Sequence, residues 1–223
     1  MATRGLHVPG IQKAVANARR FLGELLYERR YGVRTNGKLI LDAHDAESIC
    51  YAPMNWRQLH RALPPGSVSK RDVFIDIGSG KGRAVLVAAA DYPFARVIGV
   101  ELSRELHEVA ERNMATTTRR LRSADVELIC ADVREYRIPD EVSVVFMNNS
   151  VRGSIFAGVL DDISGSMRRK PRSMRLIYGN PLEEEALLAN GEWRKVRTIV
   201  PRRLRSNWPI GATCVYEWSA GTA

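Results

Sequence analysis

The sequence predicts an α/β fold, doubly wound around a mostly parallel sheet. Residues 73–83 read as an apolar strand that carries Asp76 near its end and then breaks into three alternating glycines. The run 84–90 that follows is rich in alanine, valine and leucine and is typical of a helix leaving such a turn. Two later apolar runs, 95–101 and 126–132, also end in a carboxylate. Ligands of open α/β sheets bind at these strand ends, so we expect a nucleoside site there.

The three glycines explain why the first strand can turn sharply. Gly78, Gly80 and Gly82 can adopt positive φ angles and let a ligand approach the backbone, because they carry no Cβ. Two known phosphate-binding loops do not fit the spacing. The dinucleotide motif needs a small residue where this chain has Arg83, and a Walker loop needs a hydroxyl where it has Gly82. The loop is therefore not expected to hold a phosphate.

The segment Asp76–Gly82 resembles the first motif of class I S-adenosylmethionine-dependent methyltransferases. In that family the turn wraps the methionine end of the cofactor, and an acid before the loop suits a ligand with an ammonium group and a sulfonium. The resemblance implies S-adenosyl-L-methionine as the cofactor. It places the cofactor-binding residues at Asp76, Gly78, Ser79, Gly80, Gly82, Glu101, Leu102, Asp132, Val133 and Asn148.

Within that set, two carboxylates have distinct expected roles. Glu101 follows Asp76 by 25 positions, where doubly wound folds place the acid that binds the ribose hydroxyls. Ser103 is expected to cap the helix that comes next. Asp132 matches the position at which the family accepts a hydrogen bond from the adenine amino group.

The fourth strand, 142–149, ends in two amides at the edge where the active crevice of an open α/β sheet lies. Strand-Asn-Asn resembles the lysine methyltransferases without a SET domain, the disruptor-of-telomeric-silencing family, whose first Asn helps place the target amine. The resemblance implies catalytic roles for Asn148 and Asn149. That family continues with Phe, whereas this chain has Ser150, so its lysine-channel wall does not carry over. Tyr51 resembles the tyrosine of a Tyr-x-Pro lid and is the third catalytic candidate; simple packing on the sheet is its alternative.

The remaining segments complete a seven-stranded sheet whose last pair is hairpin-like. A helix is expected within 152–167, and further strands are expected at 174–178, 192–200 and 212–218. We expect a helical N-terminal extension or lid over residues 1–70 and the methyltransferase core over residues 71–223. In the extension, one apolar helical face is formed by Ile11, Val15, Ala18, Leu22 and Leu25. Docking of this face on its own domain is expected first, with a lid over the crevice or a dimer contact as alternatives.

Composition indicates the cellular environment in which the protein works. The chain has 223 residues, 45% of them hydrophobic, and no apolar run of 18 residues. Arg4 and Lys13 place charges where a signal peptide would need an apolar stretch. We therefore expect a cytoplasmic protein without a membrane partner. The three cysteines form no CxxC pair and are expected to be reduced core thiols. A monomer or a homodimer is expected.

Basic residues raise the question of nucleic acid. The net charge is +9, and two clusters lie outside the nucleoside core. They consist of Arg168, Arg169, Lys170, Arg172 and Arg175, and of Arg194, Lys195, Arg197, Arg202, Arg203 and Arg205. No aromatic-interleaved RNA platform accompanies them, so a nucleic-acid partner is possible but a solvated surface is favoured.

These features together predict a metal-independent methyltransferase that works by in-line displacement. Amides and a tyrosine suit an amine nitrogen better than a hydroxyl, so the expected acceptor is a protein lysine or a small-molecule amine. The alternatives are an O-methyltransferase for a natural product or sugar, an RNA methyltransferase, and a catalytically silent nucleoside-binding module. The sequence does not identify the acceptor itself.

Overall fold

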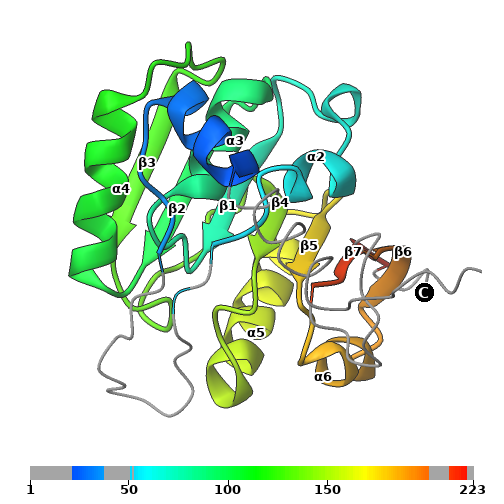
Figure 1. Cartoon of the computed structure of the whole chain (residues 1–223). Helices are drawn as coiled ribbons and strands as arrows, with labels where there is room; N and C mark the ends of the chain where they lie inside the picture. Colours follow the sequence, from blue (N-terminus) through cyan, green and yellow to red (C-terminus); the bar gives the residue numbers. More distant parts are fainter. Residues whose placement is uncertain (1–21, 38–50, 52, 201–210, 220–223) are drawn as a thin grey trace, which may run out of the picture.

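The computed structural model describes residues 22–37, 51, 53–200 and 211–219. Some sequence predictions lie outside these ranges: most of the apolar face at Ile11, Val15 and Ala18, the thiol of Cys50, and the arginines 202, 203 and 205. Within the described part, Figure 1 shows one sheet with helices on both faces.

The sheet has seven strands in the order β3-β2-β1-β4-β5-β7-β6. Their bounds are β1 Val73–Ile77, β2 Arg96–Glu101, β3 Asp125–Cys130, β4 Val142–Met147, β5 Arg175–Gly179, β6 Trp193–Ile199 and β7 Thr213–Trp218. The strands from β3 to β5 pair in parallel, whereas β7 is antiparallel to both β5 and β6. The predicted doubly wound, mostly parallel α/β fold with a hairpin-like last pair is confirmed.

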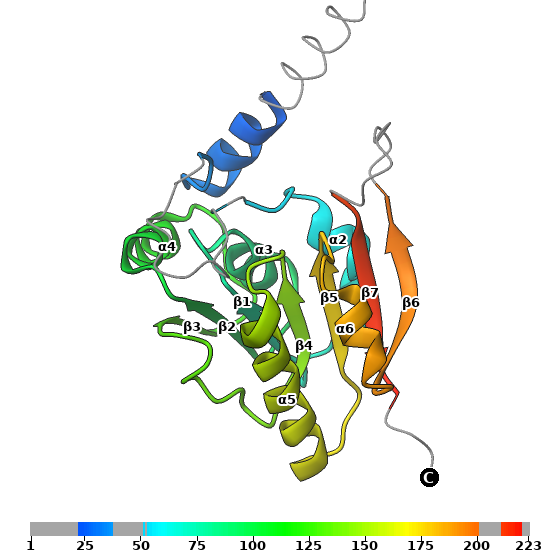
Figure 2. The same ribbon diagram turned by 90° about the horizontal axis from the view of Figure 1, so that it is seen from below.

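Helices cover both faces of this sheet, as Figure 2 shows for α3 and α5. The bounds are α2 Gln58–Ala62, α3 Arg83–Asp91, α4 Arg104–Thr116, α5 Gly153–Arg169 and α6 Glu184–Ala189, with a 3-10 turn η1 at Pro65–Ser67. One apolar cluster joins α2 and α3 to side chains such as Phe74 and Phe146, and a second joins α5 to Ile75 and Met147. Since adjacent strand residues point to opposite faces, the central strands β1, β2, β4 and β5 are buried on both sides, whereas β6 at one edge is mostly exposed.

Local signals in the sequence explain where two of these helices start. Ser103 caps α4, because its side chain accepts a hydrogen bond from the backbone N–H of Leu106, as expected. Helix α3 begins directly after Gly82, whose φ of 78° is left-handed. The run 84–90 is buried throughout, which explains why its pattern lacks a polar face.

The N-terminal extension is helical over residues 22–31 and joins the face that carries α2 and α3. Tyr27 and Tyr31 both stack on Trp56, with ring centroids 5.7 and 4.8 Å apart. Leu22 and Leu25, by contrast, are 55% and 51% exposed. The expectation that these two leucines dock on their own domain is therefore wrong, since the aromatic side of the helix makes the contact instead.

Candidate cofactor and acceptor site

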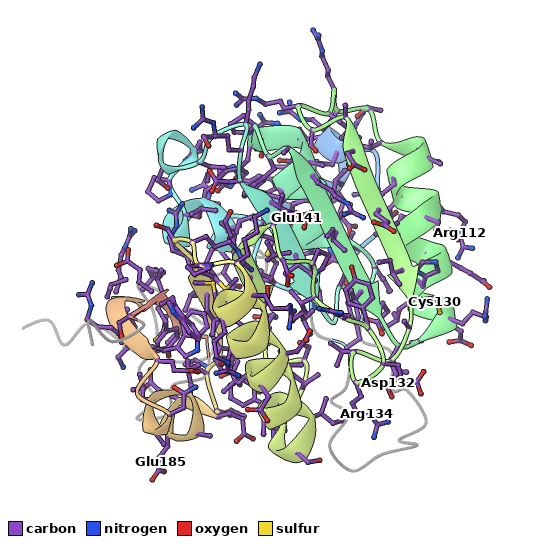
Figure 3. The ribbon with its side chains drawn as sticks, turned by 180° about the vertical axis from the view of Figure 1, so that it is seen from behind. Arg112, Cys130, Asp132, Arg134, Glu141 and Glu185 are labelled. Atoms are coloured by element: carbon purple, nitrogen blue, oxygen red, sulfur yellow. The ribbon has the colours of Figure 1, made fainter. Side chains whose placement is uncertain are left out.

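The carboxyl ends of three neighbouring strands form the candidate site. In the sheet register, Ile77 of β1 lies beside Val100 of β2 and beside Met147 of β4. The residues that follow, including Gly78, Glu101 and Asn148, therefore emerge at the same edge of the sheet. Figure 3 shows the molecule from behind, with Asp132 and Arg134, which follow β3, toward one end and Glu141, which precedes β4, nearer the other end.

The glycine loop has the geometry that its sequence predicts. Gly78, Gly80 and Gly82 have φ angles of 74°, 55° and 78°, all in the left-handed region that glycine tolerates best. The backbone N–H groups of Gly78 and Ser79 both donate to the carbonyl of Val100, each at 2.9 Å. A Cβ on Gly78 would collide with Ser150, and a Cβ on Gly80 would collide with the Tyr51 ring. These two glycines therefore make room for two other segments of the chain.

Asp76 is a buried acid at the end of β1. Its residue is 3% exposed, and none of the described residues donates a hydrogen bond to its carboxylate. Burial, and after it the neighbouring charge of Glu101, raises the pKa of Asp76 well above its usual range. An ionised carboxylate in this position needs a cation or a donor to offset its desolvation. An ammonium group such as that of methionine would supply both, so this residue fits the expected cofactor.

Glu101 joins the end of β2 to the glycine loop. Its Oε2 accepts a hydrogen bond from the Gly80 N–H at 2.7 Å, and its Oε1 accepts one from the Ser103 N–H at 2.9 Å. Burial raises the pKa of Glu101, and these backbone hydrogen bonds oppose the rise. Each carboxylate oxygen can accept a second hydrogen bond. The carboxylate can therefore brace the loop and still accept a ribose hydroxyl, as the sequence predicts.

The expected adenine side is more open. Leu102 is 56% exposed beside Glu101 and offers an apolar surface at the end of β2. Asp132 lies just past β3, where both of its oxygens contact the Arg134 guanidinium, the shortest distance being 2.6 Å. This pairing lowers the pKa of Asp132. Val133 is half-buried and packs against the cluster that contains α5. An adenine amino group would have to share Asp132 with Arg134.

Amide side chains gather where β4 and β5 end. Asn148 Oδ1 accepts a hydrogen bond from Gln58 Nε2 of α2 at 3.1 Å. Asn149 and Asn180 both have left-handed backbones, with φ of 55° and 54°, and each has a buried Oδ1 to which none of the described residues donates a hydrogen bond. Non-glycine residues with such backbones and unpartnered oxygens are uncommon and cluster at functional sites. The predicted residues Asn148 and Asn149 thus lie at the expected edge.

Ser150 explains how this chain departs from the Asn-Asn-Phe pattern. Its hydroxyl donates to the carbonyl of Ile77, and its Cβ occupies the space beside Gly78. The residue therefore ties the end of β4 to the end of β1. No aromatic wall arises at this position.

Tyr51 lies beside the glycine loop. Its ring packs against Gly80, its hydroxyl donates to the carbonyl of Thr35 at 2.7 Å, and Lys81 Nζ lies 5.1 Å from the ring centroid. Burial raises the pKa of this hydroxyl above its usual value. The packing alternative describes these contacts well, and a catalytic role for Tyr51 stays a prediction.

Arg83 is a site residue that sequence reasoning missed. Its side chain is 3% exposed and binds the N-terminal extension at several points. Nη1 lies 2.8 Å from a Glu24 carboxylate oxygen and 2.6 Å from the Met54 carbonyl, and Nε donates to Thr35 Oγ1 at 2.7 Å. The guanidinium also stacks over Trp56, 4.6 Å from its ring centroid. The first residue of α3 thus holds the extension beside the glycine loop, and only its position in the motif hinted at a role.

The described residues contain neither a metal-binding cluster nor a membrane-spanning helix. No group of three or more His, Cys, Asp or Glu side chains among them could hold a metal ion. No helix in the described ranges is long and apolar enough to cross a membrane. Cys130 and Cys214 are free thiols, the first half-buried and the second buried.

Comparison with known proteins shows to which family this chain belongs. Residues 33–170 match the family model described as histone methylation protein DOT1, which covers more than half of the chain. The chain belongs to this family. The match includes the glycine loop, Glu101, Asp132 and both asparagines of β4. The resemblance to class I S-adenosylmethionine-dependent methyltransferases, with S-adenosylmethionine as cofactor, is thereby confirmed.

Individual relatives of this DOT1-family chain differ in what they are named for. A tRNA (guanine-N(7)-)-methyltransferase of Oceanobacillus iheyensis is 32% identical over 62% of this chain and 56% of its own length. A histone-lysine N-methyltransferase, H3 lysine-79 specific, of Drosophila melanogaster is 37% identical over 28% of this chain and 3% of its own length. The chain thus spans little more than half of the first relative and a small part of the second.

Solved structures support the fold. The structure of the B. subtilis M1A22 tRNA methyltransferase has a TM-score of 0.53 with this chain at 14% identity. That similarity covers 73% of this chain and 65% of the other. At this identity the similarity shows the fold and leaves the acceptor open.

Proposed function

We propose that this protein is an S-adenosylmethionine-dependent methyltransferase that methylates an amine nitrogen, of a protein lysine or of a small molecule. The observation that carries this proposal is the set of amides at the ends of β4 and β5, next to the buried acids of β1 and β2. Amide oxygens can accept hydrogen bonds from the N–H groups of an amine. Unlike a carboxylate, an amide has no negative charge that would raise the pKa of the amine and keep it protonated. The family description, histone methylation, agrees with an amine acceptor.

The residues of the chain divide the work of binding and alignment. Asp76 would hold the ammonium of the cofactor, Glu101 its ribose, and Leu102 the face of its adenine. When bound, the cofactor supplies a methyl group on a good leaving group, so the reaction needs no covalent help from the protein. Asn148 would hold the acceptor nitrogen in line with that methyl group. Alignment and exclusion of water are worth up to roughly 7–11 kcal/mol in favourable intramolecular reactions.

A second candidate, an RNA methyltransferase, is favoured by one observation. The relative named as a tRNA methyltransferase matches 62% of the chain, and the chain has a net charge of +9 that suits a phosphate backbone. Part of this charge is already paired: Lys195 contacts Glu184 at 2.9 Å, and Arg194 contacts Glu217 at 3.1 Å. These pairs reduce the charge available for RNA on β6, so we rank this candidate second.

A labelling experiment tests both candidates. The purified chain is incubated with tritiated S-adenosylmethionine and, separately, with a protein pool containing histones, with total RNA, and with a pool of small amines. We expect label in the protein or small-amine pool and none with Glu101→Ala. Label in RNA alone would replace the first candidate with the second. Binding of S-adenosylhomocysteine without label in any pool would indicate a silent binding module.

A further inference from the structure

The glycine loop is fastened to the N-terminal extension by two cationic side chains. Lys81, between the last two glycines, is 8% exposed, and its Nζ donates to the Asn36 carbonyl at 2.8 Å. Arg83, the first residue of α3, donates from Nε to Thr35 Oγ1 at 2.7 Å and from Nη2 to Asn36 Oδ1 at 3.0 Å. Both side chains therefore bind one short segment of the extension.

That segment is itself ordered by Glu28. Its Oε1 accepts the backbone N–H of Thr35 at 2.5 Å and that of Asn36 at 2.6 Å. Thr35 is fully buried. The Glu28 carboxylate also lies 3.9 Å from Arg83 Nη2. Because one carboxylate holds both residues that accept from Arg83, the guanidinium binds a preorganised partner.

Asn113 of α4 makes a similar connection at the level of the backbone. Its Nδ2 donates to the carbonyl of Lys81 at 2.9 Å and to that of Arg34 at 3.2 Å. Its Oδ1 accepts the Arg34 N–H at 2.9 Å, and since only an oxygen can accept that hydrogen, the orientation of the amide is determined. A buried amide of α4 thus links the loop backbone to the extension.

The position of Arg83 on α3 makes the extension necessary. Arg83 is 3% exposed and lies in the first turn, where the helix dipole disfavours a cation. Burial lowers the pKa of its guanidinium, and the neighbouring charge of Glu24 opposes that shift. A buried charge that loses its partners is strongly destabilising. The start of α3 is therefore stable in this position only while the extension supplies carboxylates and oxygens.

A shift at the start of α3 would reach the cofactor side of the loop directly. Gly82 immediately precedes Arg83 and has a φ of 78°. Two residues earlier, the N–H of Gly80 donates to Glu101 Oε2 at 2.7 Å. A rotation of the backbone at Gly82 would therefore displace the donor that braces Glu101.

We propose that Arg83 is a positioning residue for the cofactor, which holds residues 78–82 in the conformation that binds S-adenosylmethionine by fixing the start of α3 to Thr35 and Asn36. This inference rests on the proposed function, in which the cofactor lies against the glycine loop and Glu101. Arg83 acts only through the loop backbone. Since coupling between two sites is reciprocal, a bound cofactor must also steady the segment that Arg83 holds.

Hydrogen exchange of the wild type tests this coupling without any substitution. The backbone amides of Thr35 and Asn36 are the reporters, because both donate to Glu28. We expect saturating S-adenosylhomocysteine to slow their exchange about fivefold or more, since it reduces local opening of this segment. The amide of Lys170, at the far end of α5, is the reference and should change little. Unchanged rates at both reporters would overturn the inference.

Variants of Arg83 then test the residue itself. Arg83→Gln should weaken S-adenosylhomocysteine binding about tenfold in calorimetry and remove the ligand-dependent slowing at the two reporters. Arg83→Lys keeps the charge without the planar fork, so it should restore affinity to within about threefold of the wild type. Affinities are measured well below the melting temperature of each variant, so that unfolding does not contribute.

The matched control is Tyr31→Phe, which weakens the extension at another place. Its hydroxyl donates to Asp91 at the opposite end of α3, away from the glycine loop. This variant should lose thermal stability and keep the wild-type affinity. If it weakens binding as much as Arg83→Gln does, general loosening of the extension explains the effect and Arg83 has no positioning role.

The remaining outcomes separate this inference from the proposed function. Should Arg83→Gln fail to fold, Asn36→Ala removes one acceptor of the guanidinium and should weaken binding about threefold; an unchanged affinity would refute the role of Arg83. If Glu101→Ala loses the ligand and Arg83→Gln keeps it, only this inference fails. If the wild type does not bind S-adenosylhomocysteine, or Glu101→Ala binds it equally well, the cofactor does not lie in this crevice and both proposals fail.

Discussion

The two halves of the carboxyl edge have opposite chemistry. On the side of β1 to β3, the strand ends carry the carboxylates Asp76, Glu101 and Asp132, whereas β4 and β5 end in the amides of Asn148, Asn149 and Asn180. A carboxylate beside an amine would raise the pKa of that amine and keep it protonated. An amide accepts its N–H groups without this penalty. The difference teaches that binding a cation and presenting a neutral nucleophile require different chemical groups, placed here along one edge of the sheet.

The largest expected effect is on the carboxylate side. Glu101→Ala removes the hydrogen bonds to Gly80 and Ser103 as well as the expected ribose contact, so affinity for S-adenosylhomocysteine should fall about 100-fold. Calorimetry measures it. Glu105→Ala, an exposed acid in the first turn of α4, is the matched control and should bind as the wild type does. Tight binding of NADH by the wild type would contradict the whole assignment of this half.

The next effect belongs to the amide side. Asn148→Ala should lower turnover about thirtyfold, because the acceptor loses alignment that a hydrogen bond to the nitrogen provides. The affinity for S-adenosylhomocysteine should stay within about threefold. Asn190→Ala, an exposed asparagine after α6, serves as the control. Turnover in the labelled pool is the measurement, and an unchanged rate would exclude Asn148 from the acceptor side.

Asp76→Asn should separate stability from binding. Burial raises the folded-state pKa of Asp76 well above its ordinary value of 3.8, so folding favours the protonated form. The ligand-free wild type therefore loses stability as the pH rises above about 3.8, toward the raised folded pKa. The variant, which cannot ionise, should melt about 3 °C higher than the wild type near pH 7, and this advantage should shrink toward pH 4.

The same variant should bind S-adenosylhomocysteine about tenfold more weakly, because the ammonium of the ligand loses a charged partner. Thermal melts across pH and calorimetry measure the two effects. A variant that is both less stable and equally able to bind would show that Asp76 already has a donor in the folded protein.

The smallest expected effect concerns Asp132. It tests whether this carboxylate takes part in cofactor binding together with Asp76 and Glu101. Arg134→Ala removes the guanidinium that contacts both oxygens of Asp132, so affinity for S-adenosylhomocysteine should rise about twofold to threefold. Arg137→Ala, a nearby exposed arginine, should leave affinity unchanged. A decrease with Arg134→Ala would mean that the ion pair holds Asp132 in its binding position.

Sequence reasoning was most successful where a local pattern determines the structure. The order of elements, the glycine loop and the acids at Asp76 and Glu101 follow from apolar runs that end in polar residues, and such runs are visible one at a time. The exposed side chains of Leu22 and Leu25 show the limit of such patterns. The apolar periodicity of a helix does not tell which of its faces packs against the rest of the protein.

Long-range contacts account for what was missed. Arg83 looked like a mismatch in a motif, yet it binds Glu24 and Met54, which lie far away in the chain. Gln58 contacts Asn148 only because α2 packs near the ends of β4 and β5. A single sequence carries no periodic signal for such pairs. Gln58 lies in the N-terminal extension, and Arg83 binds it. No sequence motif indicated where this extension lies on the core.

The interlock of Gly78 with Ser150 has a mechanical consequence. Because the Ser150 side chain occupies the space beside Gly78 and bonds the Ile77 carbonyl, neither loop can shift without the other. Stiffness gained at residues 78–82 when the crevice fills should therefore spread to residues 148–152 and slow the exchange of their backbone amide hydrogens. Binding of the cofactor would in this way also order the segment that is proposed to contact the acceptor.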